Sequence, residues 1–161
     1  MDAATLLALA VACAPGVHPA TAHALVSAES SLNPHAIGVV GGRLERQPRT
    51  AREALTTARK LQHDGWNFSI GLAQINLHSL PRLGLDVERA FDPCSNLRSM
   101  QTVLGECFDR AQSKAGDAQS ALRSALSCYY SGNFKTGFDH GYVRRVAAAA
   151  PKVMTAARPP P

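Results

Sequence analysis

The sequence has no long hydrophobic run, no internal repeat and little charge. Within its 161 residues, no apolar stretch approaches the roughly 18 residues that a membrane-spanning helix needs. Charged residues make up 18% and hydrophobic residues 45% of the chain, a balance that excludes general disorder. At this length one ordinary domain buries a core of its own without metal or covalent help.

An excess of one charge sign is also nearly missing. Lys and Arg number 17 against 12 Asp and Glu, for a net charge of +5, and the basic residues are scattered. Nucleic-acid binders usually mass their basic residues on one face, so we expect no nucleic-acid partner. A mild positive charge suits contact with an anionic polymer, and it serves solubility equally well.

Metal-ligand spacing is absent as well. The four cysteines form no CxxC pair and the six histidines have no ligand spacing, so we expect neither a metal nor a cofactor. An even cysteine count in an exported protein indicates disulfides, with buried free thiols as the alternative. On a predicted helix over 93–112, Cys94 and Cys107 lie roughly 20 Å apart, too far to pair with each other. Any bridge therefore includes Cys13 or Cys128.

An export signal is not clear in the sequence. Residues 3–14 have the apolar character of a signal peptide, and residues 12–14 resemble a cleavage site, but only Asp2 precedes them and the positive segment is absent. We interpret the segment as the first helix of the domain, because its apolar residues share a helical stripe. These residues are Leu6, Leu7, Leu9, Ala10 and Cys13.

The patterns that are present predict a mainly α protein. Helices are predicted to begin at Pro19, Thr50, Pro93 and Asp117, where capping residues or a first-turn proline precede an apolar stripe. Residues 38–44 predict a small β-hairpin around Gly41 and Gly42, which makes the class α+β. We predict one compact helical domain over 1–147 and an Ala/Pro-rich tail or linker over 148–161.

Glu29 is the most informative residue. It follows Leu25 and Val26 by four and three residues, so it shares their apolar helix face. Desolvation on such a face raises the pKa of a carboxyl group. A carboxylic acid that stays protonated near neutral pH suits general acid catalysis. The alternative is a helix-end glutamate that simply reaches water.

Two later blocks carry further polar groups. Gly71 marks a turn or a close backbone approach, and the amides of Gln74 and Asn76 can donate and accept hydrogen bonds together. Tyr129 follows Ala125 and Leu126, so its ring is predicted to point inward and its hydroxyl to seek a partner. Taken singly, these blocks fit a polar turn and a core tyrosine.

The three blocks together, 28–34, 69–76 and 128–133, resemble the lytic transglycosylases of the goose-type lysozyme superfamily. That family has a Glu-Ser block, then Gly-Leu-Met-Gln-Ile, then Ala-Tyr-Asn-Ala-Gly. The chain departs from it with Ala73 in place of Met and Tyr130 in place of Asn. It is more closely similar to the branch associated with type IV secretion, over roughly residues 10–147. The supporting segments are 13–19, 33–42, 67–69, 91–94 and 126–133.

The resemblance implies a lysozyme-like fold with a central cleft. Glu29 is then the single catalytic acid and base, held in part by Ser30, and Tyr129 bonds near the bond that is cut. The implied substrate-binding residues are Ser30, Ser69, Gln74, Asn76, Tyr129 and Tyr130.

The implied activity is cleavage of the β-1,4 bond between N-acetylmuramic acid and N-acetylglucosamine, with a 1,6-anhydro product and no cofactor. The resemblance further implies that the protein acts on peptidoglycan strands in the periplasm, with type IV secretion components as partners and a monomer as the expected state. The opened wall then serves the secretion system.

Alternatives remain open at this stage. A hydrolytic lysozyme needs a second carboxylate, for which Asp64 is the best candidate. A non-catalytic glycan-binding scaffold is the other rival. Some relatives carry a second acid where Phe138 stands here, beside Asp139. The arginine-rich segment 43–67 either rims the cleft against acidic stem peptides or forms a solvated helix face.

Overall fold

The computed structural model describes residues 1–151. These residues form a mainly helical fold with a small sheet, as predicted. The elements in chain order are α1 (Ala3–Cys13), α2 (Pro19–Ser30), β1 (Ile37–Val39), α3 (Ala51–His63), β2 (Phe68–Ile70), β3 (Ile75–Asn76), the 3-10 turns η1 (Leu77–Ser79) and η2 (Pro81–Leu83), α4 (Val87–Ala90), α5 (Pro93–Gln112), α6 (Ala118–Ser131), α7 (Thr136–Asp139) and α8 (Tyr142–Ala148).

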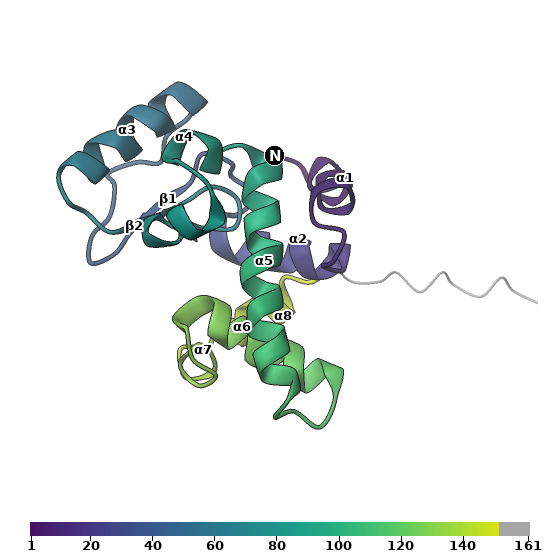
Figure 1. The fold of residues 1–161 in the computed structure, drawn as a ribbon. Helices are drawn as coiled ribbons and strands as arrows, with labels where there is room; N and C mark the ends of the chain where they lie inside the picture. The colour runs from purple at the N-terminus through teal and green to yellow at the C-terminus, as the bar shows by residue number, and fades with distance from the viewer. Residues whose placement is uncertain (152–161) are drawn as a thin grey trace, which may run out of the picture.

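The helix α5 runs through the middle of the molecule (Figure 1). The sheet, α3 and α4 lie beside one half of it, and α6 to α8 lie beside the other half. The helices α1 and α6 pack directly on α5, and α2 packs on α1 and α8. The helix α2 therefore lies between the first and the last helix of the described chain.

Most helices begin where the sequence predicts. The carboxylates of Asp92 and Asp117 accept hydrogen bonds from the backbone N–H groups of Ser95 and Ser120, which caps α5 and α6. Residues 3–13 are helical, as interpreted from the sequence, and Asp2 caps them. The last helix, α8, ends at Ala148. Most of the predicted tail, residues 152–161, lies outside the described part.

The prediction of a hairpin over 38–44 was wrong in its pairing. The structure has a three-stranded antiparallel sheet in the order β1-β2-β3, and β1 pairs with β2, beyond α3. Ile37 lies opposite Ile70, and both side chains are buried. Residues 43–46 are mostly exposed and polar, so a local hairpin buries no comparable surface. The hairpin that does exist joins β2 to β3.

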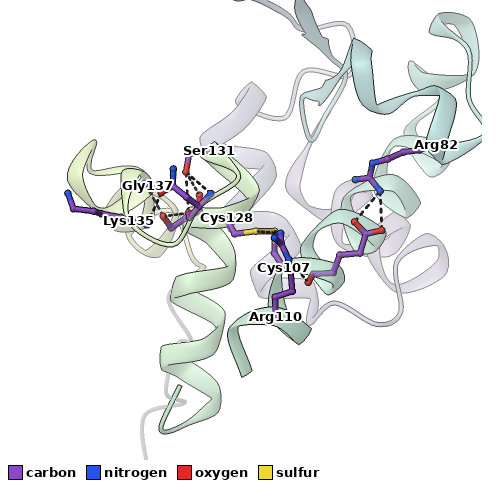
Figure 2. Close-up of a disulfide and its surroundings, with 10 residues drawn as sticks. Arg82, Cys107, Arg110, Cys128, Ser131, Lys135 and Gly137 are labelled. Carbon is purple, nitrogen blue, oxygen red and sulfur yellow. Dashed lines mark hydrogen bonds and ion pairs between the residues drawn. A yellow bond between two sulfur atoms is a disulfide. The ribbon is translucent and has the colours of Figure 1, made fainter. Parts of the chain in front are cut away.

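Two disulfides tie the helices together. Cys13 binds Cys94 and so joins α1 to α5, while Cys107 binds Cys128 and joins α5 to α6. Figure 2 shows the second bridge, with Arg110 beside it. The Arg110 guanidinium donates to the sulfur of Cys128 at 2.8 Å. Each bridge includes Cys13 or Cys128, in keeping with the distance along α5 between the other two cysteines.

None of the helices described is both long enough and apolar enough to cross a membrane.

Candidate active site

Glu29 lies in the last turn of α2, which ends abruptly. Ser31 and Leu32, the two residues after the helix, have left-handed backbone angles (φ 52° and 63°) and turn the chain away. The Tyr142 hydroxyl, from α8, donates a hydrogen bond to Oε1 of Glu29 at 2.5 Å. The helix end and this hydroxyl together hold the carboxyl in one orientation.

Burial changes the acidity of Glu29. Desolvation raises its pKa from 4.5 to about 7, against the opposing effects of the Tyr142 hydroxyl and the Arg145 charge. The nearby carboxylate in turn contributes to raising the pKa of Tyr142 above its ordinary value, although desolvation is the larger cause. A carboxyl group with a pKa near 7 can both donate and accept a proton at neutral pH.

A cleft of about 450 Å³ opens in front of Glu29. Five of the residues expected to bind substrate line it, and Glu29 is the only carboxyl-bearing residue among those lining it in the described chain. The lining residues are Glu29, Gly38, Val39, Val40, Ser69, Gln74, Ile75, Asn76, Ser79, Val103, Tyr129 and Tyr130.

The turn between β2 and β3 forms one wall of the cleft. Gln74 has a positive φ of 50°, unusual for a residue with a side chain, and its amide nitrogen donates to the carbonyl oxygens of Ala36 and Gly71. A Cβ atom on Gly38 would lie 2.6 Å from Oε1 of Gln74, so a larger residue there would have to displace the Gln74 amide. Gln74 therefore shapes the wall, and both N–H groups of its amide donate to backbone carbonyls.

The side chains of Asn76 and Ser69 are linked across the β2–β3 pair. Nδ2 of Asn76 donates to Oδ1 of Asn67 and, at 3.3 Å, to the Ser69 hydroxyl oxygen. Oδ1 of Asn76 accepts from the backbone N–H of His78 and caps η1. These bonds leave the Ser69 hydroxyl hydrogen free to donate to a ligand.

Two tyrosines of α6 also line the cleft. The Tyr129 hydroxyl donates to the carbonyl oxygen of Ala73 at 2.6 Å, so it braces the turn. Tyr130 is 41% exposed and stacks on Tyr142 with ring centroids 4.6 Å apart. Its hydroxyl pairs with Nδ1 of His140. Tyr130 thus offers an aromatic face at the rim, on which a sugar ring can stack.

Three residues considered from the sequence lie elsewhere. The Ser30 hydroxyl donates to the Val26 carbonyl of its own helix, and Ser30 does not line the cleft. Asp64 is paired with Lys60 and His63 and lines a different hollow. Asp139 forms an ion pair with Lys135. Within residues 1–151, no three His, Cys, Asp or Glu side chains gather as a metal site.

Sequence reasoning missed two residues of the site. One is Tyr142, whose hydroxyl meets Glu29 across 113 residues of sequence, so no local pattern pairs the two. Asn96 is fully buried in α5 and binds two backbone groups at the turn that leads to Gln74 and the carbonyl of Ala90 at the end of α4. The sequence feature that could have indicated Asn96 is a single amide side chain next to Leu97 in an otherwise apolar helix face.

A mainly helical fold with a single buried carboxyl in its cleft is lysozyme-like. Residues 7–150 match the transglycosylase SLT domain. The chain is 51% identical over 150 residues to the type IV secretion system protein virB1 of Brucella abortus biovar 1 (strain 9-941), an alignment that covers 89% of this chain and 63% of that protein. It is 34% identical to protein virB1 of Agrobacterium fabrum, over 88% of this chain and 58% of that protein. The chain belongs to the transglycosylase SLT family.

The chain spans about three fifths of the length of these relatives. No solved structure matches it.

Proposed function

We propose that the chain is a lytic transglycosylase, which cleaves the β-1,4 bond between N-acetylmuramic acid and N-acetylglucosamine in peptidoglycan. The single observation that carries this proposal is Glu29, a desolvated carboxyl in a cleft with a pKa of about 7. Membership of the transglycosylase SLT family supports the reaction class.

The reaction proceeds through one carboxyl group. Protonated Glu29 donates its proton to the bridging oxygen as the glycosidic bond breaks. The substrate N-acetyl group attacks the anomeric carbon from the other side, because no second carboxyl lines the described cleft. Ionised Glu29 then takes the proton of the muramic 6-hydroxyl, whose oxygen attacks the anomeric carbon, displaces the N-acetyl oxygen and closes the 1,6-anhydro ring.

Tyr142 positions the acid through both steps. Its hydroxyl donates to Oε1 of Glu29, and this bond favours the ionised form, so it limits how far burial raises the pKa. Oε2 has no protein hydrogen-bond partner within residues 1–151 and is the oxygen that would carry the transferred proton.

The Glu29→Gln variant tests the proposal. Gln keeps the shape of the side chain but cannot donate a proton to the leaving oxygen, so we expect turnover on purified peptidoglycan to fall by about 10⁴-fold or more, the upper end for general acid catalysis. Asp64→Asn and Asp139→Asn are the matched controls and should keep near-native rates. Near-native digestion by Glu29→Gln would refute the mechanism.

A hydrolytic lysozyme is the nearest rival, and product mass separates the two. The transglycosylase product weighs one water less than the hydrolytic product. Asp64 has no place in the cleft and is neutralised by Lys60, which disfavours a two-carboxylate reaction. An inactive Asp64→Asn variant with hydrolytic products from the native protein would establish the lysozyme reaction.

We further propose that the protein acts in the periplasm as a monomer and opens the wall locally for a type IV secretion system. The name of the Brucella relative, which refers to type IV secretion, and the two disulfides support this location and role.

Complementation of a strain that lacks its own protein of this family tests the secretion role. The native chain should restore substrate transfer and Glu29→Gln should not. Restoration by Glu29→Gln would instead support the non-catalytic scaffold.

A further inference from the structure

A second hollow lies next to the cleft, at the end of β1. It has a volume of about 440 Å³ and opens between α3 and the turn that follows β1. Its lining residues are Val39, Gly42, Arg43, Leu44, Thr56, Thr57, Lys60, Leu61, Asp64 and Trp66.

The hollow adjoins the cleft. Val39, the last residue of β1, lines both of them, so one strand end separates the two spaces. The backbone N–H of Val40 donates to the carbonyl of Asn67, which holds this strand end beside the chain that carries Trp66. A ligand in the cleft therefore needs to pass only this strand end to reach the hollow.

The lining of the hollow includes an apolar surface and one cationic side chain that has no partner in the described chain. The side chains of Leu44 and Leu61 form the apolar part of its lining, and Trp66 remains 46% exposed. Lys60 is neutralised by Asp64. The Arg43 guanidinium makes no hydrogen bond or ion pair with any residue of the described chain, so it is free to bind a carboxylate.

We propose that this hollow binds the stem peptide of the wall strand whose sugars occupy the cleft. This inference rests on the proposed function and adds a recognition element to it. A stem peptide is short, bears methyl and methylene groups that suit the leucine and tryptophan surface, and carries free carboxylates that suit Arg43. An extended peptide spans about 3.3 Å per residue, so three or four residues reach roughly 10–13 Å, and only the strand end at Val39 separates the two spaces.

Trp66 makes the proposal directly testable, because it is the only tryptophan of the chain. Titration of the protein with a muramoyl tetrapeptide should change the Trp66 fluorescence in a saturable manner. The variant Arg43→Ala should weaken this binding about tenfold, the effect of losing one charge-assisted hydrogen bond. Arg52→Ala removes the same charge from a residue of α3 that does not line the hollow, and it should bind as the native protein does.

A chitin oligomer of equal sugar length, which carries no peptide, is the competing ligand. If it saturates the Trp66 signal and the muramoyl tetrapeptide does not, the hollow binds sugar and the proposal is overturned. Equal binding of the tetrapeptide by Arg43→Ala and the native protein also overturns it. This titration needs no cleavage, so failure of the proposed reaction leaves its result interpretable.

A kinetic comparison gives a second, independent readout. Strands that carry stem peptides should be cleaved with a lower KM than the same strands stripped by an amidase, and Arg43→Ala should abolish that difference while its rate on stripped strands stays native. A native protein with the same KM on both substrates would refute a role for the peptide.

Discussion

The Glu29 carboxyl couples proton binding to folding. Its pKa is raised from 4.5 to about 7 by burial, so the folded protein retains a proton that the unfolded chain has lost. The stabilisation is complete below about pH 4.5 and disappears as the pH rises through 7, a change of about 3 kcal/mol.

Glu29→Gln removes this titration. We expect the stability of the variant, relative to the native protein, to rise by about 3 kcal/mol between pH 4 and pH 8, as measured by urea unfolding at each pH. Every other titrating group cancels in this difference. A difference that stays constant over the pH range would mean that the carboxyl is solvated in the folded protein.

The Tyr129 hydroxyl has a bracing role at the same scale. Tyr129→Phe keeps the ring but leaves the Ala73 carbonyl without its 2.6 Å bond, so we expect a loss of about 1–3 kcal/mol in the free energy of unfolding. Turnover should fall as well, because the freed turn carries Gln74. Tyr130→Phe removes a hydroxyl that pairs with His140 at an exposed position and should cost much less. Equal stabilities for the two variants would exclude the bracing role.

Among the elements, α5 controls the shape of the β2–β3 turn. The buried amide of Asn96 accepts a hydrogen bond from the Ala73 N–H and donates to the carbonyls of Ile70 and Ala90. Gly71 has a φ of 79°, and a Cβ atom there would clash with this amide. The cleft wall therefore depends on a glycine and an asparagine that are paired in space.

Asn96→Leu tests this dependence. Leucine has a similar size but leaves three backbone groups unpaired, so we expect a destabilisation of about 3 kcal/mol or more and a large loss of activity. Thr102→Leu, an exposed position on the same helix, is the control and should be nearly neutral. A stable and active Asn96→Leu protein would show that the turn holds its own conformation.

At the scale of the whole molecule, the two disulfides connect segments that are 81 and 21 residues apart. Loop-closure entropy assigns them about 4.5 and about 3.3 kcal/mol at 25 °C, so the Cys13–Cys94 bridge should matter more. Paired Cys→Ser variants compared by urea unfolding check this order. Free-thiol titration of the denatured, unreduced protein should find no thiols, and detection of all four would contradict both bridges.

Local chemistry in the sequence determined the helical class and most helix starts. The Asp92 and Asp117 caps act within three residues, so neighbouring residues suffice to predict them. The order of the three blocks likewise indicated the family and singled out Glu29, because a carboxyl among apolar residues on one helix face is visible without a structure.

Tertiary structure alone decided which distant segments meet. Local reasoning paired the strand at 38–44 with itself, whereas Ile37 buries its side chain opposite Ile70, beyond a whole helix. Three other contacts also join residues that are far apart in sequence. They are the hydrogen bond of Tyr142 to Glu29, the hydrogen bonds of Asn96 to the β2–β3 turn, and the cysteine pairing. Such contacts depend on how helices pack and which surfaces they bury together, and residue spacing along the chain does not contain that information.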